Sequence, residues 1–158
     1  MRLPGPRLRK GLGIAAVAGI VLLAVIQLVP YGRDHTNPPV VREPNWDTPL
    51  TANLVDRACY DCHSNQTRWP WYSNVAPMSW FVYRDVIAGR EELNFSEMGR
   101  DDNETDKAAE TVEDGEMPPF RYEVNHPEAR LDDTERQALI RGLQETLELS
   151  QSAVGTDD

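Results

Sequence analysis

The first strong pattern in the chain is a run of apolar residues near its N-terminus. Residues 11–29 read GLGIAAVAGIVLLAVIQLV, which is 19 residues without a charged side chain. A helix of this length spans roughly 28 Å, close to the thickness of the hydrocarbon core of a bilayer. The pattern therefore predicts a transmembrane anchor over residues 11–29, preceded by a basic segment over residues 1–10.

The charges before this run predict its orientation. Arg2, Arg7, Arg9 and Lys10 are all basic, and no acidic residue accompanies them. Basic residues stay in the cytoplasm, so the rest of the chain is expected on the periplasmic side of a bacterial inner membrane. A cleaved signal peptide is the alternative, but the residues after the run, QLVPY, lack the small-x-small pattern of a cleavage site.

A proline-rich segment separates this run from the remainder. Residues 30–49 contain five prolines, which remove backbone donors and restrict φ. We expect a semi-rigid tether there, followed by a folded domain over residues 50–149 and a flexible polar tail over residues 150–158.

Helical periodicity dominates the folded domain. Residues 51–59 predict a short helix with Thr51 as a possible N-cap, and residues 77–88 predict a second helix closed by Gly89. Between them, residues 64–76 combine turn formers with an aromatic cluster and predict an ordered loop.

Two more helices are expected in the second half of the domain. A thin apolar stripe at Ala108, Ala109 and Val112 predicts a short helix within residues 101–116. The last helix should begin at Asp132, which forms a capping-box pair with Glu135, and should pack against the first helix of the domain. Since no alternating strand pattern is present, the fold class is predicted to be all-α.

Charge narrows the possible partners. The chain has 16 basic and 26 acidic residues, a net charge of −10, and residues 31–158 hold 12 basic and all 26 acidic residues. Such a domain is repelled by phosphate backbones, which argues against nucleic-acid binding. Residues 101–116 form an acidic stretch that would complement a basic redox partner, although solubility is the commoner role of such a stretch.

The strongest chemical signal is the sequence Cys59-Tyr60-Asp61-Cys62-His63. This C-x-x-C-H spacing attaches a c-type haem. Two intervening residues bring both sulfurs to one side of a helical turn, where they form thioethers with the porphyrin vinyl groups. The histidine that follows then ligates the iron as the proximal ligand. We therefore expect one haem c.

The two cysteines have two alternative uses. A redox-active dithiol needs a βαβ context, which the flanking residues lack. A structural zinc site needs four ligands, and the chain offers two thiols with His35, His63 and His126. The adjoining His63 favours haem over both.

The sixth iron ligand has several candidates. Met117 is favoured because it lies in GEMPP, where glycine ends a helix and two prolines stiffen the backbone. His126, nine residues later, is the fallback, with a role in orienting its own loop as the alternative. Met78 is more plausibly a packing residue, Met98 is a weaker candidate, and His35 is expected to be solvated.

Aromatic residues near the motif are candidates for the wall of a haem pocket. Trp69 and Trp80 are assigned this role, with Trp71 and Tyr72 nearby. The alternative is that these side chains fill the core of a small domain, which is compatible with the same role.

Several stretches together resemble a known family. They are CYDCHS at residues 59–64, TRWPWYSNVAPMSW at 67–80, DVIAGREELNFSE at 85–97, GEMPPFRY at 115–122 and HPEARL at 126–131. The chain is similar to bacterial haem-binding domain proteins, which are small and cytochrome c-like, from about residue 50 to residue 147. The resemblance implies a membrane-anchored, periplasm-facing monohaem domain with Cys59 and Cys62 as attachment points and His63 as iron ligand. In cytochrome c-like proteins the distal methionine precedes a proline, which corresponds to Met117.

The chain departs from this family at two positions. Tryptophan is expected in place of Met98 and in place of Gly142. Both departures concern packing rather than iron ligation.

The sequence therefore predicts a membrane-anchored c-type cytochrome that transfers electrons through Fe(III)/Fe(II) and is not an enzyme. One alternative is a haem-based sensor or peroxidase-like enzyme with an open sixth position, in which Arg121 and His126 could supply acid–base chemistry. A second alternative is an assembly factor that uses Cys59 and Cys62 as free thiols.

Overall fold

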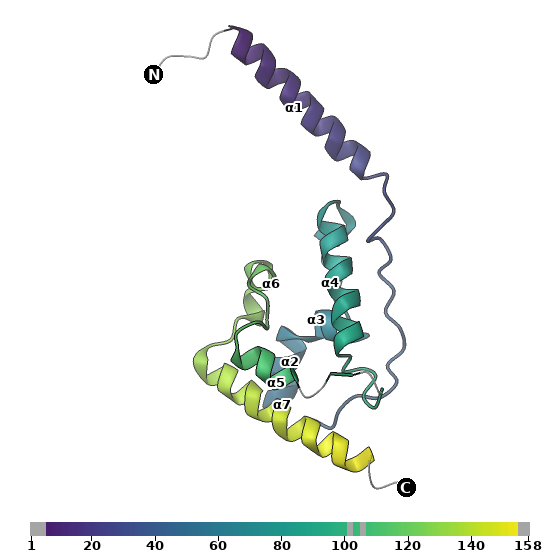
Figure 1. Ribbon diagram of the computed structural model, residues 1–158, viewed down its shortest axis with the longest axis vertical. Helices are drawn as coiled ribbons and strands as arrows, with labels where there is room; N and C mark the ends of the chain where they lie inside the picture. The colour runs from purple at the N-terminus through teal and green to yellow at the C-terminus, as the bar shows by residue number, and fades with distance from the viewer. Residues whose placement is uncertain (1–5, 101–102, 105–106, 155–158) are drawn as a thin grey trace. The chain divides into compact units, whose positions relative to one another are not determined.

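The computed structural model describes residues 6–100, 103–104 and 107–154, and these residues form an all-α protein (Figure 1). The only strand-like feature in these ranges is an isolated bridge between Arg42 and Glu97, so the predicted fold class is confirmed. The helices are α1 (Pro6–Ile26), α2 (Pro49–Ala58), α3 (Tyr60–His63), α4 (Met78–Glu92), α5 (Ala108–Glu113), α6 (Phe120–Asn125) and α7 (Asp133–Val154). Single 3₁₀ turns occur at Trp71–Asn74 and Pro127–Ala129.

The chain divides into two compact units. The N-terminal unit joins residues 1–35 to residues 70–83, and the larger unit joins residues 36–69 to residues 84–158. The CxxCH motif belongs to the larger unit.

The uncharged part of helix α1 is shorter than the predicted membrane anchor. The helix ends at Ile26 rather than at Val29, and its uncharged part, from Gly11 onward, has 16 residues. At 1.5 Å per residue this part spans roughly 24 Å, less than the ~30 Å of a hydrocarbon core. Among the residues that the structure describes, no helix has the length and hydropathy needed to cross a membrane. The transmembrane anchor predicted over residues 11–29 is therefore not found.

The rest of the N-terminal unit is held by polar contacts between residues 27–35 and residues 70–83. The Gln27 side-chain amide donates to the Ala76 carbonyl at 2.9 Å and accepts from the Ala76 amide at 3.0 Å. The His35 ring donates to the Ser73 carbonyl at 3.1 Å and is half-buried, so the expectation of a solvated His35 is wrong. Gly32 has φ +77, and a Cβ there would lie 2.5 Å from the Ser79 carbonyl oxygen.

The proline-rich segment differs from the predicted tether in its second half. As expected of its prolines, it contains no helix before Pro49, where α2 begins, but residues 36–47 are bonded along the larger unit. Asn37 donates to the Thr67 carbonyl at 2.9 Å, and the Val41 amide donates to the Ser96 carbonyl at 2.9 Å. Trp46 packs edge-on against Phe95, with ring centroids 5.3 Å apart. The segment therefore covers part of the core, and the larger unit begins at Thr36 rather than at residue 50.

The core of the larger unit lies where α2 and α5 pack against α7 (Figure 1). It is formed by the buried apolar side chains Leu54, Val55, Tyr60, Leu93, Phe95, Met98, Ala108, Ala109, Val112, Leu139, Ile140, Leu143 and Leu147. The predicted contact between the first and last helices of the domain is confirmed. It explains one departure from the family pattern, because a Cβ at Gly142 would lie 2.1 Å from the Thr51 hydroxyl oxygen.

The ends of the helices agree with the sequence in some places and differ in others. The capping box is present, with the Glu135 amide donating to Asp132 Oδ1 at 2.8 Å and the Asp132 amide donating back to Glu135 Oε2 at 3.1 Å. The N-cap of α2 is Thr48 rather than Thr51, because Thr48 Oγ1 accepts from the Thr51 amide at 3.2 Å.

Two further boundaries differ from the prediction, and one helix was not predicted. Helix α4 continues through Gly89 to Glu92, where the glycine lies against the Cys62 backbone. Helix α6 was not predicted from the sequence. Helix α7 extends to Val154, so residues 150–154 are helical, while residues 155–158 of the predicted tail lie outside the described residues.

Candidate functional site

The two cysteines lie at the junction between α2 and α3. Cys59 ends α2 by donating its amide to the Val55 carbonyl at 2.9 Å, and its own carbonyl accepts from the amides of Cys62 at 3.1 Å and His63 at 2.9 Å. This single turn brings both thiols and the imidazole into one short segment. The thiols are free and half-buried.

The His63 ring is held by a carbonyl that is distant in sequence. His63 Nδ1 lies 3.0 Å from the Leu93 carbonyl oxygen. A carbonyl can only accept, so Nδ1 carries the proton and the lone pair is on Nε2. Burial lowers the pKa of His63, which keeps the ring neutral. The ring therefore presents Nε2 in the form that ligates a metal, oriented by a partner behind it.

Both thiols are stabilised in the neutral form. Burial, with a smaller contribution from Cys62, raises the pKa of the Cys59 thiol to about 12. Burial, followed by the carboxylates of Asp61 and Asp85, raises the pKa of the Cys62 thiol to about 12. Reactive dithiols instead have lowered pKa values.

A close approach between helices brings α4 against the motif. A Cβ at Gly89 would lie 2.6 Å from the Cys62 carbonyl oxygen and 3.1 Å from its Cβ. Only glycine permits this separation, so Gly89 sets how near α4 lies to α3.

The loop that follows the motif is fixed by Arg90. This buried side chain donates to the Ser64 carbonyl at 2.8 Å and to Thr67 Oγ1 at 2.9 Å. It also donates to the Thr36 carbonyl at 3.2 Å and to Asn37 Oδ1 at 2.9 Å, so one guanidinium joins the loop to the proline-rich segment.

Buried amides continue this network toward residue 93. The Asn65 backbone N–H donates to Ser96 Oγ at 3.0 Å, and the Asn94 side-chain amide donates to Asn65 Oδ1 at 2.8 Å. The Phe95 amide donates to the His63 carbonyl at 2.8 Å. Together these bonds hold the Leu93 carbonyl where His63 meets it.

Asp61, between the cysteines, connects the motif to α6. Its carboxylate is buried, and Oδ2 accepts a 2.7 Å hydrogen bond from the Tyr122 hydroxyl. Its other oxygen, Oδ1, accepts from the Arg68 amide at 3.1 Å and from Arg68 Nε at 3.0 Å.

Met117 lies five residues before Tyr122 on the loop that enters α6. Its amide donates to the Thr111 carbonyl at 3.0 Å, and the preceding Gly115 has φ +73, in keeping with a glycine that ends α5. Its side chain is half-buried and packs against the same hydrophobic core as Cys59.

The other candidate ligands have different surroundings. Met98 is buried in the hydrophobic core, and Met78 is exposed in the N-terminal unit. The His126 ring stacks on Tyr122 at a centroid distance of 4.2 Å, and His126 Nδ1 lies 3.0 Å from Glu128 Oε1. These contacts favour the loop-orienting role for His126.

The two predicted wall residues belong to different units. Trp69 is half-buried in the larger unit, and its indole N–H donates to Asn37 Oδ1 at 3.2 Å. Trp80 belongs to the N-terminal unit, and its indole nitrogen is buried without a hydrogen-bond partner among the described residues. The assignment of both residues to a haem wall stays a prediction.

The donor set fits a covalently attached haem. Two free thiols within one helical turn match the attachment chemistry, and the neutral imidazole next to them offers Nε2 to iron. In the part of the chain that the structure describes, no group of three or more His, Cys, Asp or Glu residues is arranged to hold a metal ion directly.

Sequence reasoning did not assign a site role to Asp61, Gly89, Arg90 or Tyr122. Asp61 is inside the motif, and the other three lie in the stretches that carry the family resemblance. Their place in the motif or in these stretches was the available signal for a site role. The sequence does not show their contacts, because these contacts join segments that are far apart along the chain.

Comparison with known proteins gives one match. A protein-family model described as a haem-binding domain matches residues 21–145, which is most of the chain. Searches of curated proteins and of solved structures found no match.

Proposed function

We propose, on the premise that this chain belongs to the haem-binding domain family, that it is a monohaem c-type cytochrome that transfers electrons. The observation that carries the proposal is the arrangement of His63: its Nδ1–H is bound to the Leu93 carbonyl, so the lone pair is on Nε2, and two free thiols lie in the same short segment. This is the arrangement of a histidine whose second nitrogen serves as a metal ligand.

The roles of the three motif residues follow from this geometry. Cys59 and Cys62 would hold the haem through thioethers, and His63 Nε2 would be the proximal iron ligand. When bound, the haem supplies one-electron chemistry between Fe(III) and Fe(II). The Leu93 carbonyl orients the imidazole and increases its basicity.

Met117 is the proposed distal ligand. Its loop is anchored to α5 through Thr111, and its side chain packs on the same core as Cys59. A thioether ligand raises the potential of the haem relative to ligation by two histidines.

The thiol-redox alternative has less support. Both cysteine thiols have pKa values raised to about 12, whereas dithiol exchange requires an accessible thiolate.

The direct test is covalent haem content. The full chain should be produced with and without the c-type haem maturation machinery, and the product examined by pyridine haemochrome absorbance and by mass spectrometry. One haem per chain is expected only with the machinery. Cys59→Ala/Cys62→Ala should lose covalent attachment, because both thioethers are removed. A colourless wild-type protein from a competent host would contradict the proposal.

The distal ligand has a separate spectroscopic test. The ferric protein should show a methionine-to-iron charge-transfer band, and Met117→Ala should lose it while retaining covalent haem. Met98→Leu is the matched control, because Met98 is buried in the core, and the band should persist. Persistence of the band in Met117→Ala would exclude Met117.

Binding of CO to the wild-type protein and to Met117→Ala separates the electron carrier from the sensor or peroxidase-like enzyme. An open sixth position in the wild-type protein would bind CO rapidly in the ferrous state, and this result would favour the sensor or enzyme. With Met117 as ligand, CO binding should be slow in wild type and fast in Met117→Ala.

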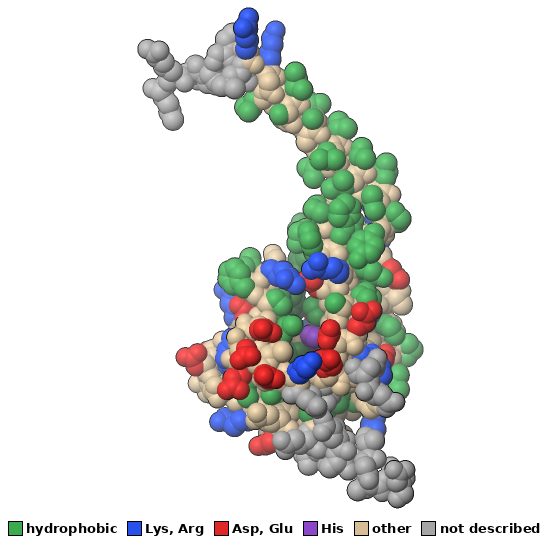
Figure 2. All heavy atoms as spheres, in the orientation of Figure 1, with side chains coloured by type: hydrophobic (Ala, Val, Ile, Leu, Met, Phe, Trp, Pro, Cys, Tyr) green, Lys and Arg blue, Asp and Glu red, His purple; other side chains and the backbone are tan. Residues whose placement is uncertain are grey.

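We also place the haem domain outside the bacterial inner membrane, with a basic redox protein as its partner. Support for the location comes from the four basic residues within positions 1–10 and from the exposed apolar side chains of α1 (Figure 2). Support for the partner comes from acidic side chains that gather over α5 (Figure 2), including the exposed residues Glu110, Glu113, Asp114 and Glu116.

A further inference from the structure

We propose that Asp61 and Tyr122 are positioning residues that hold the Met117 loop on the haem-attachment motif. The inference rests on the proposed function, since it concerns the distal ligand of that haem. Asp61 lies between the two cysteines, and Tyr122 is on α6, directly after the loop that carries Met117. One hydrogen bond therefore joins the proximal motif to the distal loop across 61 residues of sequence.

The bond has the features of a strong interaction. The Tyr122 hydroxyl and Asp61 Oδ2 are 2.7 Å apart, and the residue Asp61 is only 7% exposed. A hydroxyl that donates to a carboxylate forms a charge-assisted bond, roughly twice as strong as a neutral one. Both oxygens of the Asp61 carboxylate accept hydrogen bonds, since Oδ1 is bound by the Arg68 backbone amide and by Arg68 Nε.

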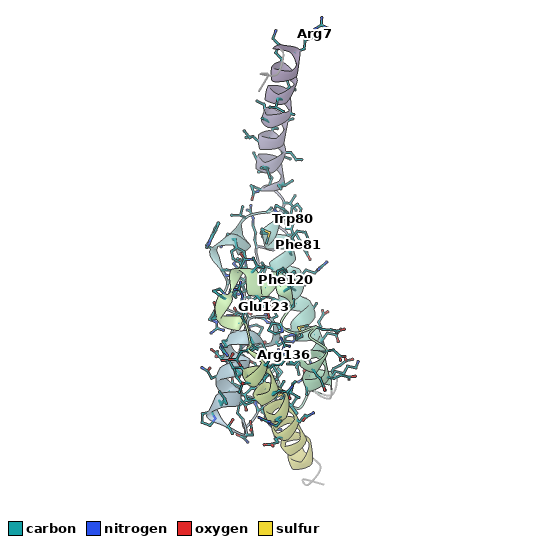
Figure 3. All side chains as sticks on the ribbon, turned by 90° about the vertical axis from the view of Figure 1, so that its left-hand side faces the viewer. Arg7, Trp80, Phe81, Phe120, Glu123 and Arg136 are labelled. Atoms are coloured by element: carbon teal, nitrogen blue, oxygen red, sulfur yellow. The ribbon has the colours of Figure 1, made fainter. Side chains whose placement is uncertain are left out.

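Helix α6 depends on this bond because it has little else to hold it. None of its residues is buried. Its first residue, Phe120, is labelled in Figure 3, and it is 80% exposed. Burial of apolar surface therefore does not set its position.

Two further polar contacts of α6 are exposed. Arg121 lies 3.0 Å from Asp85, but the arginine side chain is 66% exposed, and Arg130 Nε donates to the Glu123 carbonyl at 3.2 Å in an exposed position. Exposed pairs contribute little to stability, so the Asp61–Tyr122 bond is the main polar anchor of the segment after Met117. On the upstream side, the loop is anchored by the Met117 amide bond to the Thr111 carbonyl.

The consequence concerns how firmly Met117 is held as a ligand. With the hydroxyl of Tyr122 removed, the downstream end of the loop is freed, and an external ligand competes better for the sixth position. A hydrogen bond to a charged group corresponds to about a tenfold change or more in such an equilibrium.

The experiment uses the haem-loaded full chain and imidazole as the competing ligand. Tyr122→Phe retains the ring that stacks on His126 and loses only the hydroxyl. Imidazole should bind ferric Tyr122→Phe about tenfold more tightly than wild type, with a weaker methionine-to-iron charge-transfer band.

Tyr31→Phe is the matched control. It removes a tyrosine hydroxyl outside the Met117 loop and outside the haem-attachment motif, and Tyr31 is an exposed residue. Its imidazole affinity and band should equal those of wild type. An equal change in both variants would show general destabilisation and would overturn the inference, as would wild-type behaviour of folded, haem-loaded Tyr122→Phe.

A second readout does not require haem. Backbone amides of residues 117–126 should exchange with deuterium faster in haem-free Tyr122→Phe than in haem-free wild type, and unchanged exchange would contradict the anchoring role. A wild-type protein that fails to take up haem contradicts the proposed function. A haem-loaded protein in which Tyr122→Phe changes nothing contradicts only this inference.

Discussion

The thiols of Cys59 and Cys62 show what individual residues contribute to the site. Each is half-buried, and each has a pKa raised to about 12, for which burial is the largest cause. At neutral pH both remain protonated, so they are poor nucleophiles for disulfide exchange. The residues thus differ from a redox-active dithiol in electrostatics, although the C-x-x-C spacing is the same.

This difference predicts the pH dependence of thiol alkylation in the haem-free chain. Because the folded state disfavours the thiolate, iodoacetamide should react at pH 8 at least tenfold more slowly with the folded protein than with the urea-unfolded chain. The rate should rise with pH up to about 12, where the thiols ionise. Mass spectrometry of the alkylated protein measures both rates.

The raised pKa values of the two thiols also make the folding stability depend on pH. The folded pKa lies above the ordinary value of 9.0, so the unfolded chain loses these protons first. The contribution to folding stability is therefore present below pH 9 and is lost between about pH 9 and 12.

Rapid alkylation of the folded chain at pH 8 would show that the thiols are reactive and would favour the assembly-factor alternative.

Among the elements, the contact between α3 and α4 depends on a glycine inside a helix. Glycine lowers helix stability by roughly 1 kcal/mol relative to alanine, and α4 nevertheless continues through Gly89. The reason is the Cys62 carbonyl, which a Cβ at this position would approach to 2.6 Å. Packing against the motif therefore outweighs helix propensity at this position.

Gly89→Ala should consequently destabilise the protein despite its better helix propensity. Overpacking against a backbone carbonyl costs about 1–3 kcal/mol, and the displacement of α4 should lower haem incorporation. Urea unfolding and haemochrome absorbance measure the two effects.

Gly19→Ala on α1 is the matched control for Gly89→Ala. A Cβ at Gly19 meets no atom within 4 Å, so the free energy of unfolding should stay the same or increase. A Gly89→Ala protein that is as stable as wild type would show that α3 and α4 are not in close contact.

For the whole molecule, the distribution of charge matters more than the net value of −10. The basic residues within the first ten positions and the acidic residues of the larger unit lie at separate places in the sequence. A strongly acidic domain raises the encounter rate with a basic partner, and this effect falls with ionic strength. The charge thus supports the proposed partner class and leaves the chemistry to the haem-attachment motif.

Much of the fold was predictable from local patterns. The apolar stripe of α5 and the capping box of α7 depend on residues three or four positions apart, and a single turn satisfies those spacings. Helix α6 was missed because none of its residues is buried. It therefore lacks the buried apolar stripe that marks α2, α5 and α7. The end of α4 was misjudged because Gly89, read locally, is a helix terminator.

By itself, the sequence determined the all-α class, the main helices, the adjacency of Cys59, Cys62 and His63, and the resemblance to the haem-binding domain family. These properties depend on short-range spacing along the backbone. The tertiary structure alone decided which nitrogen of His63 carries the lone pair, through Leu93, and how the segment after Met117 is joined to Asp61, through Tyr122. Those contacts link residues 30 and 61 positions apart, and their geometry depends on how whole segments pack rather than on any local pattern.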